Sequence, residues 1–330
     1  APFCFAQIGS RWSLISGTRR ALYEMPCEKV YDFTMKNKTK RIESKTSRTA
    51  EMTCLSRAAS FYEKKSQYRS NDFIAPKLVP RILLPFLKLR VFRKIYKNKL
   101  SPNGIYEYVI ARTKYIDLIF EKAVSKEFDQ ILVFGAGFDS RGIRFLNENG
   151  KTKVFELDVS IIQNAKINQL KKRRVELNPH IIFISIDFNK ESLENKLIEF
   201  GFEKNKRSLF ILEGLVMYLS KESVDSTFKI IERFSGINSE IVFDYVYLSV
   251  LRREDIYYGE KGIFDMVNKA GEGWTFGIEK GGIETFLKNY NFSIIEYYNS
   301  EELENKYFKD EYGNIIGRIN GTHCIAYAKK

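Results

Sequence analysis

Residues 129–145 read DQILVFGAGFDSRGIRF, a short apolar run that enters a glycine-rich turn and then a predicted helix. Two further apolar runs end in an acid, VFELD at 154–158 and SLFILE at 208–213. In a parallel α/β sheet, glycines after the first strand let a ligand approach the backbone, and an acid after the second can hold ribose hydroxyls. These segments therefore predict an α/β sheet that binds a nucleoside.

The net charge of +13 is concentrated near the start of the 330-residue chain. Residues 1–100 hold 22 Lys and Arg against 7 Asp and Glu, whereas the other 230 residues hold 32 against 34. Nucleic-acid binding domains carry their excess positive charge on the binding fold itself. Because the predicted sheet is close to neutral, we expect no nucleic-acid partner.

The four cysteines are scattered without a C-x-x-C pair, and the chain has only two histidines. This composition argues against a structural metal site or a disulfide framework and favours a cytoplasmic location. No apolar run reaches the roughly 18–20 residues of a membrane span, and the first residues lack the pattern of a signal peptide. We expect no metal and no transmembrane segment.

The chain divides into three predicted parts. Residues 1–34 fit no period, and Met35 begins an ordinary polar segment, so we expect 1–34 to be disordered or not native. Residues 35–104 are predicted as a basic helical extension or lid, with a helix over 47–73. The catalytic domain is predicted at 105–330.

Residues 81–100 mix apolar and basic side chains. They could form an amphipathic helix that contacts acidic lipid, or a packing helix whose lysines extend into solvent. Pro85 interrupts the helical pattern, which favours the packing helix and leaves membrane contact as the weaker alternative.

From Ile105 onward, apolar runs of strand length alternate with helical stretches. Such alternation predicts a doubly wound α/β fold with a mostly parallel sheet covered on both faces. The last two runs, 292–298 and 324–329, are separated by a segment that contains Gly313, Gly317 and Gly321. We therefore predict a terminal hairpin with an antiparallel edge strand.

The glycine turn departs from the dinucleotide fingerprint. Gly135 and Gly137 fit the G-x-G start, but Asp139 and Ser140 follow where a phosphate-binding turn would continue to a third glycine. A carboxylate beside the turn disfavours pyrophosphate and suits a cationic nucleoside. S-adenosylmethionine is such a cofactor.

Three acids at strand ends are candidate cofactor ligands. Asp158 is placed to hold the ribose hydroxyls, or is simply solvated. Asp187 could line the adenine together with Phe188, or could cap the following helix. Glu213 follows an apolar strand, so it needs a cationic partner, either the amino group of the cofactor or Arg112.

Several segments together resemble the leucine carboxyl methyltransferases and their bacterial and archaeal relatives, which include polyketide O-methyltransferases. The resemblance covers roughly Thr49 to Lys330. Its matching segments, in order, are SRTAEMTCLSRA, NDFIAPKLV, ARTKYID, VFGAGFDSRGIRF, VFELDVS, SIDFN, FILEGLVMYLS and GWTFGIEKGGIETFLKNYNF. The combination of GAGxDxR, FExD and xxEGxxMYL carries the resemblance. Phe188 stands where a leucine is usual.

The resemblance implies a seven-stranded class I methyltransferase sheet with a helical lid and S-adenosylmethionine as cofactor. It implies that Arg112 binds the methionine carboxylate and that Glu213 lies near the methionine moiety. It implies further roles for Gly135 and Gly137 behind the cofactor, Asp158 at the ribose, and Asp187 with Phe188 at the adenine.

The expected activity is methyl transfer to a carboxylate or hydroxyl oxygen of a small molecule or peptide. A carboxylate acceptor needs no general base, whereas a hydroxyl needs one, for which His323 and Tyr218 are the candidates. The sequence alone assigns no base. The alternatives are a nicotinamide-dependent oxidoreductase, against which Asp139 and Ser140 argue, and a non-catalytic cofactor-binding module.

Overall fold

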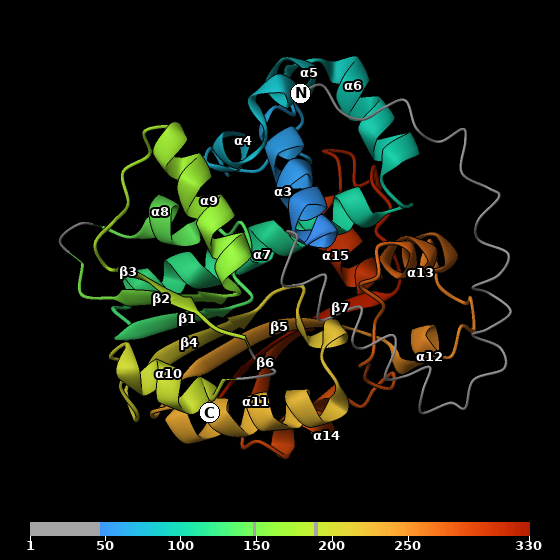
Figure 1. The fold of residues 1–330 in the computed structure, drawn as a ribbon. Coiled ribbons are helices and arrows are strands. Elements are labelled where there is room, and N and C mark those ends of the chain that lie inside the picture. Colours follow the sequence, from blue (N-terminus) through green and yellow to red (C-terminus); the bar gives the residue numbers. More distant parts are fainter. Residues whose placement is uncertain (1–46, 148–149, 188–190) are drawn as a thin grey trace, which may run out of the picture. The chain divides into compact units, whose positions relative to one another are not determined.

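The computed structural model describes residues 47–147, 150–187 and 191–330 (Figure 1). The predicted disordered segment 1–34 and the beginning of the predicted lid lie outside the described residues. Phe188 also lies outside them.

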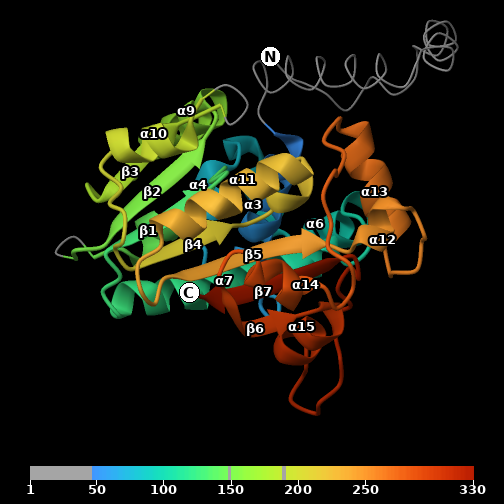
Figure 2. The ribbon, with the colours of Figure 1, turned by 90° about the horizontal axis from the view of Figure 1, so that it is seen from below.

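A seven-stranded sheet forms the centre of the described fold, with strand order β3-β2-β1-β4-β5-β7-β6. The strands are β1 (Gln130–Phe134), β2 (Lys153–Asp158), β3 (Ile181–Ser185), β4 (Ser208–Leu212), β5 (Glu240–Val246), β6 (Ser293–Tyr298) and β7 (His323–Lys329). Neighbouring strands from β3 to β5 are parallel, and β7 runs antiparallel to both β5 and β6 (Figure 2). The predicted doubly wound, mostly parallel fold with an antiparallel last strand is confirmed.

The predicted antiparallel pairing of the last two strands at the sheet edge is confirmed, and only the connection between them differs from the prediction. Strand β7 lies between β5 and β6, so β6 is the edge strand. Helix α15 (Ser300–Tyr307) lies in the connection between β6 and β7, where only a loop was expected. It begins with a capping box in which Asn299 and Glu302 bond each other's backbone N–H. That N-x-x-E signal is present in the sequence and indicates a helix.

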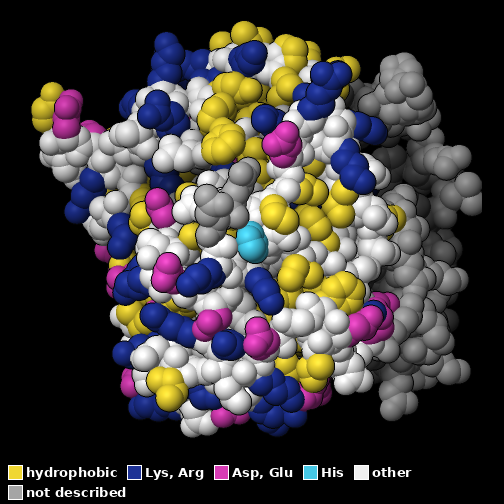
Figure 3. Space-filling view, turned by 90° about the vertical axis from the view of Figure 1, so that its left-hand side faces the viewer, with side chains coloured by type: hydrophobic (Ala, Val, Ile, Leu, Met, Phe, Trp, Pro, Cys, Tyr) yellow, Lys and Arg dark blue, Asp and Glu magenta, His cyan; other side chains and the backbone are white. Residues whose placement is uncertain are grey.

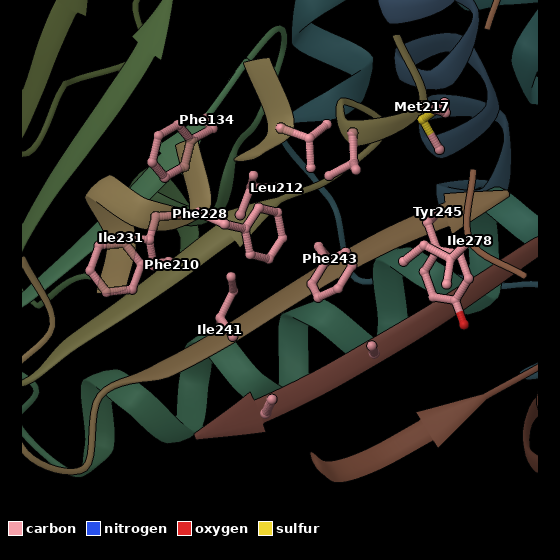
Figure 4. Packing of buried hydrophobic residues seen from close by; sticks show 14 of the residues in the cluster. Phe134, Phe210, Leu212, Met217, Phe228, Ile231, Ile241, Phe243, Tyr245 and Ile278 are labelled. Carbon is pink, nitrogen blue, oxygen red and sulfur yellow. The ribbon is translucent and has the colours of Figure 1, made fainter. Parts of the chain in front are cut away.

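Helices cover both faces of the sheet (Figure 1). One face packs against α10 (Leu193–Glu199), α11 (Lys221–Phe234), α13 (Glu260–Lys269) and α14 (Ile283–Lys288); the other packs against α3 (Arg48–Phe61), α7 (Ile105–Ser125), α8 (Arg141–Phe145) and α9 (Ser160–Lys172). Alternate residues of β1 divide between these faces, since Leu132 belongs to the first core and Val133 to the second. In Figure 4, Phe228 and Ile231 of α11 lie over Phe210, Leu212 and Phe243.

The residues before α7 form short helices. After the 14-residue α3, they are α4 (Ala75–Leu78), η1 (Arg81–Leu83), α5 (Leu84–Lys88), α6 (Arg90–Ile95) and a π-helical turn, η2 (Tyr96–Leu100). The helix predicted over 47–73 ends at Phe61, after which the Ser60 hydroxyl donates to the carbonyl of Tyr68 at 2.5 Å. Pro85 lies in the first turn of α5, where proline is tolerated, so it does not break that helix.

Three short elements complete the description, namely η3 (Val216–Tyr218), α12 (Leu248–Leu251) and the loop 271–282 that follows α13. No helix among the described residues is both long and apolar enough to cross a bilayer.

Candidate active site at the carboxyl ends of the strands

The turn after β1 is bonded to the end of β2. Gly135 and Gly137 have φ angles of +58° and +52°, a conformation that side chains disfavour. The N–H of Gly137 donates to Asp158 Oδ2 at 2.6 Å, and the N–H of Ala136 donates to the carbonyl of Leu157 at 2.8 Å. Gly137 and Asp158, two candidate residues that lie 21 positions apart in the sequence, are therefore in direct contact.

Asp158 is buried and accepts backbone hydrogen bonds on both oxygens. Its Oδ1 accepts the N–H of Val159 at 2.7 Å. Burial raises the pKa of Asp158 to about 6, although the two N–H groups oppose that shift. Each carboxylate oxygen has a second lone pair, so the group can still accept hydrogen bonds from hydroxyls.

Glu213 lies between two arginines. Its Oε1 is 2.9 Å from Nε of Arg112, on α7, and its Oε2 is 2.7 Å from Nη1 of Arg141, at the start of α8. The sequence had named Arg112 as one possible partner for this carboxylate. The structure therefore brings Arg112 and Glu213 together, and Arg141 joins them.

Arg141 has a place in the site that the sequence analysis did not assign. Its guanidinium also pairs with Asp139 and with Asp117, the latter at 2.8 Å. Its Nη2 is buried and has no hydrogen-bond partner among the described residues. The final arginine of the GAGxDxR motif was the available signal, because an arginine directly behind the glycine turn must lie near any ligand there.

The pairing with Arg141 changes the expected effect of Asp139 on a ligand. Burial alone would raise the pKa of Asp139, but the charges of Arg141 and Lys166 bring it down to about 2. This carboxylate is ionised and neutralised by an arginine, so it presents little net charge to a ligand. Repulsion of phosphate by Asp139 is therefore a weaker argument than the sequence suggested.

Asp244 is a second group that sequence analysis missed. It is fully buried in β5, and its Oδ2 accepts from Arg112 Nη1 at 2.7 Å and from the Tyr108 hydroxyl at 2.8 Å. Its Oδ1 accepts the N–H of Gly214 at 2.6 Å. An acid within the apolar strand EIVFDYV was a usable signal, since a buried carboxylate requires donors.

Helix α3 is bonded to the glycine turn through a buried ion pair. Arg57 lies 2.7 Å from Asp72, and its other terminal nitrogen donates to the carbonyl of Phe138 at 2.7 Å. The Ser140 hydroxyl donates to Asp72 at 2.8 Å. This pair holds α3 against the loop that follows Gly137.

The beginning of α3 is held by the loop after α13. Glu272 accepts the N–H groups of Arg48 and Thr49 at 3.1 and 3.2 Å, and it also accepts the Thr49 hydroxyl. These are amides of the first helical turn, which have no partner within the helix. A Cβ placed on Gly137 would lie 3.6 Å from Cβ of Ala50, so the first turn of α3 covers the glycine turn.

Asp187 follows β3, with its N–H donating to Glu191 Oε2 at 2.8 Å. The alternative role of Asp187 as a helix cap is wrong, because Ser192 is the N-cap of α10 and accepts from the N–H of Asn195. The structure places Asp187 at the same end of the sheet as Asp158, in line with the register of β2 and β3.

The rings of His323, Tyr108 and Trp274 form an aromatic cluster near Arg112. The His323 ring is 4.4 Å from the Tyr108 ring and 5.2 Å from the Trp274 ring, measured between centroids. Burial and the charge of Arg112 lower the pKa of His323 to about 3. Burial raises the pKa of Tyr218, on η3, to about 12. The N–H of Thr275 donates to the carbonyl of Met217 at 2.8 Å, which holds the loop 271–282 against η3.

Among the described residues, no group of three His, Cys, Asp or Glu side chains could hold a metal ion. The arrangement instead offers backbone N–H groups, a buried carboxylate for hydroxyls and a spare arginine donor. These groups suit an organic ligand with hydroxyls and a carboxylate.

The known proteins that are similar to this chain include methyltransferases. The family model for leucine carboxyl methyltransferase matches residues 50–232. A Bacillus subtilis protein provisionally named S-adenosyl-L-methionine-dependent methyltransferase YktD is 24% identical over 73% of this chain and 77% of its own. A Mycobacteroides abscessus protein with the same provisional description is 31% identical, over 39% of this chain and 42% of its own.

Among solved structures, magnesium protoporphyrin IX methyltransferase from Synechocystis PCC 6803 aligns over 72% of this chain and 92% of its own. The identity is 13% and the TM-score 0.42.

A seven-stranded sheet of this order, with glycines after β1 and an acid at the end of β2, defines a class I methyltransferase, and the relatives identify its cofactor as S-adenosylmethionine. The chain belongs to the leucine carboxyl methyltransferase family. The resemblance noted in the sequence is therefore confirmed.

Proposed function

We propose that this chain methylates an oxygen atom, and specifically a carboxylate of a small molecule or peptide. The observation that carries the proposal is the burial of His323, the candidate base, between the rings of Tyr108 and Trp274. His323 has a pKa of about 3 and Tyr218 one of about 12, so neither is matched to proton abstraction near neutral pH. An ionised carboxylate needs no proton removed before it attacks.

We propose that the cofactor lies across the carboxyl ends of β1, β2 and β4. In this arrangement Gly135 and Gly137 allow close approach, and Asp158 accepts the ribose hydroxyls. Arg112 and Glu213 lie at the methionine end, where Arg141 Nη2, which has no partner within the described part of the chain, is a further donor for the methionine carboxylate. Asp187 and Phe188 remain the proposed adenine neighbours.

Bound S-adenosylmethionine supplies a methyl group on a sulfonium, which is already activated for displacement. The residues of the chain hold the acceptor in line and exclude water, and such positioning can contribute several kcal/mol. We propose that α3 acts as the lid in this task, because its first turn lies over Gly137 and is bonded to Glu272.

The bond that methyl transfer forms, an ester or an ether, distinguishes a carboxylate acceptor from a hydroxyl acceptor. The full-length protein would be incubated with S-adenosylmethionine tritiated in its methyl group and with panels of carboxylic acids, peptides and phenols. A methyl ester releases volatile tritiated methanol in mild alkali, whereas a methyl ether does not.

We expect alkali-labile product from acceptors with a carboxylate, and no such product from their amides. Transfer that yields only alkali-stable product would contradict the carboxylate proposal and favour a hydroxyl acceptor. In that case His323→Ala should abolish turnover while leaving S-adenosylhomocysteine binding intact.

A further inference from the structure

Residues 73–106 contain eight Lys and Arg and no Asp or Glu. Much of this segment forms η1, α5, α6 and η2. Within residues 81–100, six large apolar side chains are exposed, with fractions between 46% and 75%; they are Ile82, Phe86, Leu89, Val91, Ile95 and Leu100. Five basic side chains are exposed among them; they are Arg81, Lys88, Arg90, Lys94 and Lys99. These eleven residues are called the outer face.

The inward side of the same segment combines apolar and charged contacts, since Leu87 and Tyr96 are buried in the core beside Arg93. Arg93 is only 3% exposed, donates to the carbonyls of Leu87 and Lys88 at 2.8 and 2.9 Å, and lies 3.0 Å from Glu63. Lys97 pairs with Glu107 at 2.5 Å. These apolar and charged contacts anchor α5, α6 and η2.

Helix α6 packs Phe92 partly against the core, but its buried side chain is a cation, Arg93. A surface helix normally turns its apolar stripe toward the core and its charges toward water. Here the cation Arg93 is buried with carbonyl and carboxylate partners, whereas Val91 and Ile95 are 71% and 47% exposed. The packing helix favoured from sequence does not account for these exposed side chains, because their apolar surface remains in water.

Exposed apolar side chains that gather on a soluble protein mark an interaction surface. At the top of Figure 3, the end of the molecule where α5 lies in Figure 1, hydrophobic and basic side chains are interspersed. Apolar groups flanked by cations, without acids, match the composition of segments that lie in the interface of an anionic bilayer.

We propose that the outer face binds the surface of a membrane rich in acidic lipids. The basic side chains would contact the headgroups, and the side chains of Leu89, Val91 and Ile95 would enter the boundary of the acyl region. Residues 1–46 are less suited than acidic lipid to cover the outer face, because they are themselves positively charged, with nine Lys and Arg against four Asp and Glu. Nucleic acid is also less suited to the outer face than acidic lipid, because its phosphates make no apolar contact with the exposed aliphatic side chains.

Vesicle sedimentation with the full-length protein tests this proposal. Vesicles of phosphatidylcholine alone would be compared with vesicles that also contain phosphatidylglycerol. We expect binding to the anionic vesicles to exceed that to neutral vesicles by more than about tenfold, and to weaken at high salt because the headgroup contacts are screened.

Two variants separate the contributions of charge and apolar contact. Arg90→Glu with Lys94→Glu reverses two exposed cations, and Val91→Glu removes an apolar contact. Matched controls are Lys221→Glu with Lys280→Glu, which reverses two exposed cations elsewhere, and Ile237→Glu, at a side chain that is 86% exposed. We expect the outer-face variants to lose binding more than about tenfold and the controls to retain it.

The proposal is overturned if the wild-type protein stays in the supernatant with anionic vesicles. It is also overturned if the outer-face variants sediment as well as their controls. Retention of the protein by a short DNA duplex without vesicle binding would assign the outer face to nucleic acid instead. None of these readouts depends on methyl transfer, so the outcome is independent of the acceptor.

Discussion

The carboxylate of Asp158 lies 2.6 Å from the N–H of Gly137, which joins the acid at the end of β2 to the glycine turn after β1. In the proposed arrangement this pair would contact the ribose and hold the cofactor against the backbone. The raised pKa of the carboxylate makes that function sensitive to pH.

Cofactor affinity should fall as the pH drops. The pKa of Asp158, about 6, lies above its ordinary value of 3.8, so the ligand-free protein takes up a proton between pH 7 and pH 5. Protonation removes acceptor capacity for the ribose hydroxyls. We expect the affinity for S-adenosylhomocysteine, measured by calorimetry, to fall about tenfold over this range. Asp158→Asn should bind weakly at both pH values, and an equal pH slope in that variant would assign the effect to another group.

Glu213→Gln keeps the shape of the side chain but leaves two buried arginines short of one negative charge. Arg112 retains Asp244, and Arg141 retains Asp139, so the sheet should still fold. We expect the free energy of unfolding to fall by about 2–3 kcal/mol and cofactor affinity to fall more than about tenfold. Urea unfolding and calorimetry measure the two effects.

The matched control for Glu213 is Glu279→Gln, which breaks an exposed contact with Arg252 at 2.6 Å. Such exposed pairs are screened by solvent and contribute little to stability, and cofactor affinity should not change. Equal losses of stability in the two variants would show that Glu213 is not held as a buried partner of the arginines.

Gly137→Ala tests the close approach to the glycine turn. An alanine at φ +52° costs about 1–2 kcal/mol, and its Cβ would lie between the backbone and Ala50. Gly313→Ala imposes similar backbone strain at φ +83° with no atom within 4 Å of the new Cβ. We expect both variants to lose similar stability in urea, but only Gly137→Ala to weaken S-adenosylhomocysteine binding. Equal binding by both variants would place the cofactor elsewhere.

Glu272→Ala should loosen the first turn of α3, because the N–H groups of Arg48 and Thr49 lose their acceptor. Loss of a comparable cap costs about 0.5–2 kcal/mol. Hydrogen exchange over residues 48–53 should become faster, and S-adenosylhomocysteine should dissociate faster if α3 is the lid.

The control for Glu272 is Glu302→Ala, which removes the capping box of α15 and leaves α3 untouched. Its effect on exchange should be confined to residues 299–307. Unchanged exchange at 48–53 in Glu272→Ala would mean that the bond to Glu272 does not hold the helix closed.

Much of the sheet could be predicted from local patterns. Strand β1 alternates between two cores, and the apolar runs that follow it mark the other strands of the parallel part. Helix α15 was not predicted although Asn299 and Glu302 form a capping box, because the glycines that follow it in the sequence favour a loop.

The site could be predicted only in part, for a physical reason. Gly137 and Asp158 were predicted to share a ligand because parallel strands end at the same edge of the sheet. Arg141 and Asp244 were not predicted, because their importance depends on which charges lie within 3 Å across distant segments. Asp244 and Arg112, for example, are 132 positions apart in the chain.

The sequence alone determined the alternation of strands and helices in the parallel part of the sheet, the glycines after β1 and the acids at the strand ends, because these follow from local periodicity and backbone sterics. Tertiary structure decided which carboxylate neutralises which arginine, since buried charges pair by proximity in space. It also decided that Arg93 lies inside and Val91 outside, because Glu63 and the carbonyls at the end of α5 accept the guanidinium only once those segments have packed together.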